Sequence, residues 1–114
     1  MTVERQIIFY KRYFMDFYEE QSENVQAKIE WTLALIKITL HVPEKYFKHL
    51  EGTKGLYEIR VEAGSSIYRI FSFFDKGNIV VVGNAYLKKT QKTPKKEIDK
   101  ALRIMEEYKN EKGK

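Results

Sequence analysis

The sequence contains no cysteine, and it has only two histidines among its 114 residues. The absence of cysteine excludes disulfide frameworks, cysteine-ligated zinc sites and cysteine nucleophiles. It is also typical of reducing compartments, so we expect a cytoplasmic protein. The two histidines, His41 and His49, have no second histidine or acid at the spacing of a metal site. We therefore expect neither a metal nor another cofactor.

Long hydrophobic runs are also missing. No stretch approaches the roughly 18 apolar residues of a membrane helix, and the longest candidate, Trp31–Val42, is interrupted by Lys37 and His41. The first residues, Met1–Gln6, show no apolar run behind a basic start, so no signal peptide is expected. The length and the 43% of hydrophobic residues are typical of one folded domain over residues 1–114.

The excess positive charge is concentrated in a single segment. The formal net charge is +5, yet basic and acidic residues balance both in residues 1–84 and in residues 97–114. The segment Ala85–Lys96 holds five lysines and no acid. These lysines are Lys88, Lys89, Lys92, Lys95 and Lys96. The whole excess therefore lies in this segment, which indicates an anionic partner.

Hydrophobic spacing predicts a strand and two helices in the first part of the chain. A short apolar run predicts the strand Gln6–Tyr10. Apolar residues at helical spacing then predict an amphipathic helix over residues 11–21 and a second one that begins at the N-cap Ser22 and stops before Pro43. The segment Pro43–Gly55 is predicted to be irregular.

Alternating apolar residues predict three further strands, over Leu56–Glu62, Ile67–Phe74 and Ile79–Leu87. Thr93 is expected to cap a last helix, with Pro94 at its first position. The resulting order, β-α-α-β-β-β-α, indicates an α+β fold. We expect an antiparallel meander that is covered by helices on one face.

The lysine-rich segment lies directly before the predicted last helix, whose N-terminus itself favours anions. Lysines neutralise phosphate charge, while hydroxyl and amide groups donate hydrogen bonds to phosphate oxygens. A solvated lysine-rich loop is the simpler interpretation, but acids are interspersed everywhere else in the chain. The residues expected to bind backbone phosphates are Lys92, Lys95, Lys96, Gln91, Thr90 and His49.

Two arginines lie on the predicted strands. Arg60 is on the polar face of its strand, where it could form a cross-strand pair with an acid such as Glu58 or Glu62. Arg69 shares a face with apolar residues, which is unusual for a charge, and could form an ion pair at the sheet edge. The alternative is that both arginines belong to one basic face, since the planar guanidinium group matches phosphate well. Spacing alone favours neither interpretation.

Several stretches together resemble a known family. They are Lys48-His-Leu-Glu-Gly52, Gly55-Leu-Tyr-Glu-Ile-Arg60, Tyr68-Arg-Ile-Phe71, Gly83-Asn-Ala-Tyr-Leu-Lys-Lys-Thr-Gln-Lys-Thr-Pro94 and Glu97 with Ala101. This pattern resembles the RelE/HigB-like toxins of type II toxin–antitoxin systems. It is most similar to the phage-derived branch, whose signature is an aromatic residue followed by Lys-Lys-Thr-x-Lys-Thr-Pro. The similarity by motif covers about residues 45–108.

The resemblance implies a small RelE-like domain that acts as a ribosome-dependent endoribonuclease on messenger RNA. It also implies a cognate antitoxin, of the helix-turn-helix type, that binds and blocks the toxin. Arg60 and Arg69 match the basic positions on the family's sheet, and Lys88 and Lys89 match those after the last strand. Glu58 stands where RelE itself has a lysine, which leaves the general base open.

Metal-independent RNA cleavage requires the ribose 2′-hydroxyl to attack the adjacent phosphorus, with one group to remove a proton and another to supply one. Positioned cations stabilise the charge that develops on the phosphate. The predicted catalytic residues are Arg60, Arg69, Lys88, Lys89 and Tyr86. We expect the arginines and lysines to hold the phosphate. Candidates for proton transfer are a lysine, Tyr86 and His49, and Tyr86 could instead stack on a base.

Other functions remain as alternatives. A non-catalytic RNA-binding module could use the same basic face without cleaving RNA. DNA binding is disfavoured because the predicted last helix exposes Glu97, Asp99 and Glu106. A structural or adaptor protein would leave the local charge unexplained.

Overall fold

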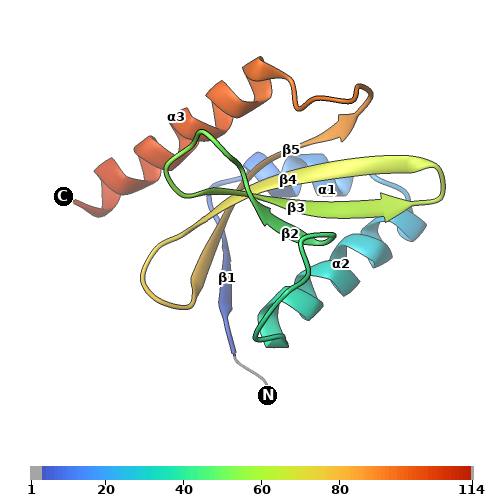
Figure 1. The fold of residues 1–114 in the computed structure, drawn as a ribbon, viewed down its shortest axis with the longest axis horizontal. Helices are drawn as coiled ribbons and strands as arrows, with labels where there is room; N and C mark the ends of the chain where they lie inside the picture. The colour runs from blue at the N-terminus through green and yellow to red at the C-terminus, as the bar shows by residue number, and fades with distance from the viewer. Residues whose placement is uncertain (1–3, 114) are drawn as a thin grey trace.

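The computed structural model describes residues 4–113, in which three helices surround a five-stranded sheet (Figure 1). The predicted α+β class is confirmed. The elements in chain order are β1 (Gln6–Phe9), α1 (Tyr13–Glu19), α2 (Glu23–Ile38), β2 (Phe47–His49), β3 (Leu56–Ala63), β4 (Ser66–Phe74), β5 (Ile79–Lys88) and α3 (Lys95–Lys112). No helix in this part of the chain has the length and apolarity needed to cross a bilayer. The prediction about Met1–Gln6 falls partly outside the described residues.

The strands lie in the order β1-β5-β4-β3-β2. β3, β4 and β5 form the predicted antiparallel meander, and β1 joins it in parallel beside β5. β5 therefore has a neighbour on each side. Its run Ile79–Val82 is apolar on both faces, which is what a strand in the interior of a sheet requires.

β2 is a strand that the sequence prediction missed, because Pro43–Gly55 was expected to be irregular. Residues Phe47–His49 pair with β3 in antiparallel register. The Phe47 ring stacks on Tyr57 with a centroid distance of 4.9 Å. Three residues are too few to show an alternation, so the strand is recognised only from its pairing with β3.

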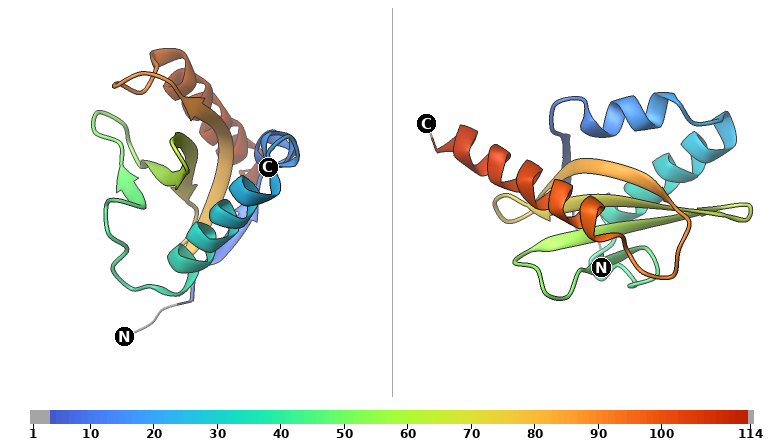
Figure 2. Two further views of the ribbon diagram at one scale, coloured as in Figure 1. Left: turned by 90° about the vertical axis from the view of Figure 1, so that its right-hand side faces the viewer. Right: turned by 90° about the horizontal axis from the view of Figure 1, so that it is seen from above.

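The helices cover both faces of the sheet, so the prediction that they lie on one face is wrong. α2 and α3 lie on opposite sides of the strands in Figure 1, and Figure 2 shows the same arrangement from two further directions. α1 and α2 contribute to the core cluster that contains Ile59 and Ile70, whereas α3 packs against Phe73 and Val81. The strands bury apolar side chains in both directions, and each face therefore needs a cover.

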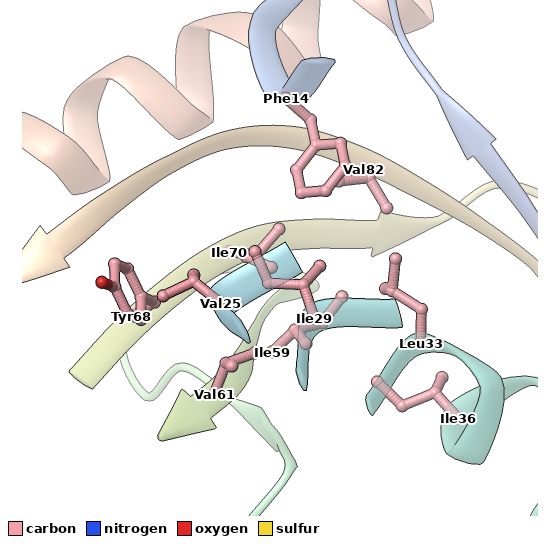
Figure 3. Close-up of a cluster of buried hydrophobic side chains, with 10 residues drawn as sticks. All are labelled: Phe14, Val25, Ile29, Leu33, Ile36, Ile59, Val61, Tyr68, Ile70 and Val82. Atoms are coloured by element: carbon pink, nitrogen blue, oxygen red, sulfur yellow. The ribbon is translucent and has the colours of Figure 1, made fainter. Parts of the chain in front are cut away.

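The predicted apolar stripe of α2 forms the core on its face of the sheet, as Figure 3 shows. Its buried residues are Val25, Ile29, Thr32, Leu33 and Ile36. The predicted N-cap is confirmed, because the hydroxyl oxygen of Ser22 accepts a hydrogen bond of 3.4 Å from the Val25 amide. Each turn of the helix thus places one large aliphatic side chain on the sheet.

An irregularity in β5 decides which side chains reach the α3 face. The pairing of β4 with β5 shifts register between Ile70 and Ser72. Val81 faces α3 before the shift, and Tyr86 faces it after the shift. A bulge changes the alternation in this way because it inserts an extra residue into one strand. The even-numbered residues at the end of β5 therefore lie on the α3 face.

α3 begins one residue later than predicted, and its N-cap residue is Pro94 rather than Thr93. The Thr93 side chain makes no cap; its hydroxyl donates a hydrogen bond of 2.8 Å to the Glu58 carboxylate on β3. A charged acceptor holds a hydroxyl more strongly than a helix end does. The residue predicted to start the helix therefore fastens the preceding loop to the sheet.

Candidate functional site

Three of the predicted site residues form a row across the sheet. Arg60 on β3 lies directly opposite Arg69 on β4, and Arg69 lies directly opposite Tyr86 on β5. Lys88 follows Tyr86 by two residues and therefore lies on the same face. The structure thus brings together residues from three strands on the α3 face, near the point where the lysine-rich loop leaves β5.

A single buried carboxylate, that of Glu58, lies at the centre of this row. Its side chain is 3% exposed. One carboxylate oxygen accepts a hydrogen bond of 3.3 Å from Arg60. The other oxygen lies 3.9 Å from Nε of Arg69. This second oxygen also accepts the hydrogen bond from Thr93. Of the two acids considered for Arg60, Glu58 is the partner found in the structure. The carboxylate connects β3, β4 and the loop before α3.

The two arginines carry more positive charge than this carboxylate balances. The Arg69 side chain is 9% exposed, and burial lowers the pKa of its guanidinium group. Nε of Arg60 and Nε of Arg69 are both buried and make no hydrogen bond. Like charges directly opposite each other are unfavourable in a sheet. An anion with several oxygens would relieve this arrangement, and phosphate has the geometry to accept from both guanidinium groups.

The two lysines that follow β5 differ in environment. Lys88 is half-buried, whereas Lys89 is exposed. Burial lowers the pKa of Lys88, and the charge of Arg69 lowers it further. A lysine with a lowered pKa is a better proton carrier near neutral pH. Lys88 is therefore better placed for proton transfer than Lys89.

Tyr86 uses its ring in the core. The ring stacks on Phe71 with a centroid distance of 5.8 Å, and the residue is 9% exposed. Stacking of this ring on an RNA base, as the sequence analysis allowed, would require it to leave that contact. Burial also raises the pKa of the Tyr86 hydroxyl, so the group stays protonated and can donate a hydrogen bond.

The remaining residues of the lysine-rich segment are distributed along an exposed loop. Lys88, Lys89, Thr90 and Gln91 line an open depression of about 400 Å³ together with Ile67. The residues Lys92, Lys95 and Lys96 are exposed as well. Lys95 forms an ion pair of 2.9 Å with Asp99, four residues further along α3. Exposed pairs of this kind are weak, so most of the loop's charge remains available.

His49 lies away from this site. It is in register with Tyr57 on β3 and contacts that ring edge to face, with a centroid distance of 5.3 Å. Because successive residues of a strand point to opposite faces, Tyr57 and His49 point away from the face that carries Glu58. The structure therefore separates His49 from the arginines, and we do not retain it as an RNA-binding residue.

Lys48 is a site residue that the sequence analysis missed. It lies directly opposite Glu58 in the pairing of β2 with β3, and it is half-buried on the face that carries the arginines. The signal for this placement is the alternation within β2, which can be used only once the strand is recognised. Thr93 was likewise identified as a helix cap and not as a partner of Glu58.

No group of three or more histidine, aspartate or glutamate side chains in the described residues converges as metal ligands would. The site consists of cations, one carboxylate and hydroxyl groups. These groups can bind an anion and transfer protons.

A protein-family model matches most of the chain. The family model described as "Phage derived protein Gp49-like (DUF891)" matches residues 16–106. This range includes α2, the β3–β5 meander, the lysine-rich loop and most of α3. A search of curated proteins finds no match.

We predict that the Thr93→Val substitution loosens the lysine-rich loop. Losing a hydrogen bond to a carboxylate costs about 1.5–3 kcal/mol, and residues 88–94 should exchange their amide hydrogens faster as a result. Hydrogen exchange followed by mass spectrometry measures this directly. Thr93→Ser keeps the hydroxyl and should restore slow exchange.

Thr32→Val is the matched control for this prediction. The Thr32 side chain is buried, and its hydroxyl donates to the Lys28 carbonyl within α2. Its loss should leave exchange in the loop unchanged. Equal loop exchange in Thr93→Val and the wild-type protein would contradict the tethering role of Glu58.

Proposed function

Because the chain belongs to the Gp49-like family of phage-derived proteins, a toxin family of the type II toxin–antitoxin kind, we propose that it is a toxin that cleaves messenger RNA on the ribosome and is neutralised by a cognate antitoxin. Toxins of this family are generally endoribonucleases. The observation that carries the proposal is the pair of arginines that share one buried carboxylate.

The electrostatics of this pair suit the transition state of RNA cleavage. Attack on phosphorus increases the negative charge on the phosphate oxygens, and cations that are already in place stabilise that charge without reorganising. Arg60 and Arg69 are held by Glu58 and by their strands, and each retains a donor without a partner. The site is therefore organised for a phosphate before one arrives.

In the proposed reaction, the ribose 2′-oxygen loses its proton to a base and forms a bond to phosphorus. The bond from phosphorus to the 5′-oxygen breaks, and that oxygen takes up a proton from an acid. The products are a 2′,3′-cyclic phosphate and a 5′-hydroxyl end, so atoms and charge balance without a further reactant. Arg60 and Arg69 bind the phosphate, and Lys88 is the candidate for moving a proton. The Tyr86 hydroxyl is a possible hydrogen-bond donor to the same phosphate.

Dependence on the ribosome follows from the resemblance to RelE/HigB-like toxins and is supported by the loop. Lys89, Lys92 and Lys96 are exposed in the loop that follows β5 and at the start of α3, and such cations bind RNA backbone in a sequence-independent way. These lysines give the protein a surface that can bind the ribosomal RNA around the messenger. The alternative function, an RNA-binding module without catalysis, would use the same cations but leave the messenger intact.

We expect Arg69→Ala to abolish toxicity when the protein is expressed without an antitoxin. Loss of one transition-state donor costs roughly 10²–10³-fold in rate, and growth and messenger cleavage report it together. Arg69→Lys keeps the charge but loses the planar fork, so it should remain strongly impaired.

Lys89→Ala should weaken toxicity, whereas Lys109→Ala, an exposed lysine in the last turn of α3, should not. Full growth arrest and cleavage by both Arg69→Ala and Lys89→Ala would refute the assignment.

The rate of cleavage should depend on pH through Lys88. If neutral Lys88 removes the 2′ proton, the cleavage rate rises with pH up to the pKa of Lys88, which burial and Arg69 hold below the ordinary value for lysine. Lys88→Arg keeps the charge but cannot lose its proton at these pH values, so the variant should be slow and should lose the inflection. Lys89→Arg should keep it. An unchanged pH profile of single-turnover cleavage in Lys88→Arg would exclude Lys88 as the base.

A further inference from the structure

A second cationic surface adjoins Arg60 at the edge of β3. β2 pairs only as far as Ile59, and the Arg60 amide then donates a hydrogen bond of 2.8 Å to the Tyr46 carbonyl. Beyond this point no strand covers the edge of β3 in the described structure. A depression of about 200 Å³ lies there, which we call the edge depression. Its lining residues are Lys28, Lys45, Tyr46, Arg60, Glu62 and Gly64.

Aromatic rings border this depression. Trp31 on α2 is 48% exposed and contacts the Tyr46 ring edge to face, with a centroid distance of 5.5 Å. The ammonium group of Lys28 lies 4.5 Å from the centre of the Trp31 ring, and that of Lys45 lies 5.5 Å from the centre of the Tyr46 ring. Trp31 contributes little to the core, since the neighbouring residues Ile29 and Leu33 are the ones that face the sheet.

The charge of the edge depression is positive. Lys28, Lys45 and Arg60 line it with one acid, Glu62. Glu30, the acid next to Trp31 in the sequence, accepts a hydrogen bond from the Tyr18 hydroxyl. The surface therefore combines excess cations with exposed aromatic rings, as surfaces that bind single-stranded nucleic acid do.

We infer that the edge depression binds a nucleotide of single-stranded RNA that flanks the cleaved phosphate. Lys28 and Lys45 would bind its phosphate, and Trp31 and Tyr46 would contact its base. This inference rests on the proposed function, because Arg60 belongs both to the edge depression and to the row with Arg69.

The geometry favours RNA as the occupant. Neighbouring strands lie about 4.8 Å apart, so the edge depression is about 10 Å from Arg69 across the sheet, a distance that a few nucleotides can span. RNA uses both properties of the surface, since its phosphates pair with lysines and its bases stack on rings. An acidic protein segment would use the lysines alone, and an apolar one would have to cover the ammonium groups of Lys28 and Lys45 without giving them a counter-charge.

The test uses intrinsic fluorescence, because Trp31 is the only tryptophan in the sequence. The probe is a short single-stranded RNA with 2′-O-methyl groups, which the protein cannot cleave because the attacking hydroxyl is blocked. The RNA should quench Trp31 in a saturable way. Lys28→Ala should weaken RNA binding, measured by anisotropy of labelled probe, roughly tenfold. Lys37→Ala, an exposed lysine in the last turn of the same helix, is the control and should leave both signals unchanged.

A second variant tests the ring itself. Trp31→Leu should weaken RNA binding, while Trp31→Phe should retain most of the affinity because it keeps an aromatic face. Both positions, 28 and 31, lie on the surface of α2, so circular dichroism should show an unchanged fold. Lys28→Ala and Trp31→Leu should both raise the RNA concentration that gives half-maximal cleavage, because each removes a contact to the bound RNA.

Two fluorescence results would overturn the inference. One is RNA binding without any change in Trp31 emission. The other is equal quenching by polyglutamate, which would assign the surface to an acidic protein segment. If the wild-type protein binds RNA with the expected quenching and variant effects but cleaves none on the ribosome, the proposed function fails and the edge depression stands as an RNA site. If Arg69→Ala abolishes cleavage but Lys28→Ala and Trp31→Leu leave binding unchanged, only the inference fails.

Discussion

The arrangement of the site depends on the carboxylate of Glu58. Two arginines on adjacent strands would repel each other if nothing stood between them, and Arg69 would lie buried without a counter-charge. Glu58 supplies one negative charge to both arginines and fixes the loop before α3 through Thr93. The charge that remains is positive and is held on rigid strands. A phosphate group can balance this remaining charge.

The fold provides this arrangement through two features of its sheet. Apolar side chains on both faces bring α3 onto the side opposite α1 and α2, which shelters the face where Glu58 lies. The register shift in β5 then turns Tyr86 and Lys88 toward that same face. At Gly83, a side chain would lie 3.4 Å from a methyl group of Ile104 on α3, so glycine allows the helix to approach this part of β5 closely. β5 therefore determines both how closely α3 packs and which face carries Tyr86 and Lys88.

Local patterns predicted the parts of this structure that depend on local spacing. The four-residue steps of Val25 and Ile29 gave α2, and the alternation in β3 and β4 gave the meander. Counting charges located the lysine-rich loop. Which partner satisfies a polar side chain depends on tertiary contacts, so Thr93 was assigned to a helix cap although its acceptor is a distant carboxylate. His49 was assigned to the basic face because it lies close to it in sequence, whereas the pairing of β2 with β3 places it on the opposite face.

The central claim is that the arginine pair carries positive charge that is reserved for a phosphate. Its most direct test is the unfolding temperature of the wild-type protein and of Arg69→Met with and without the 2′-O-methyl RNA. At a concentration of about 100 times Kd, a ligand stabilises the folded protein by about 2.7 kcal/mol, which raises the unfolding temperature by several degrees for a domain of this size. The account predicts that rise in the wild-type protein and its loss in Arg69→Met. An equal rise in both proteins would contradict it.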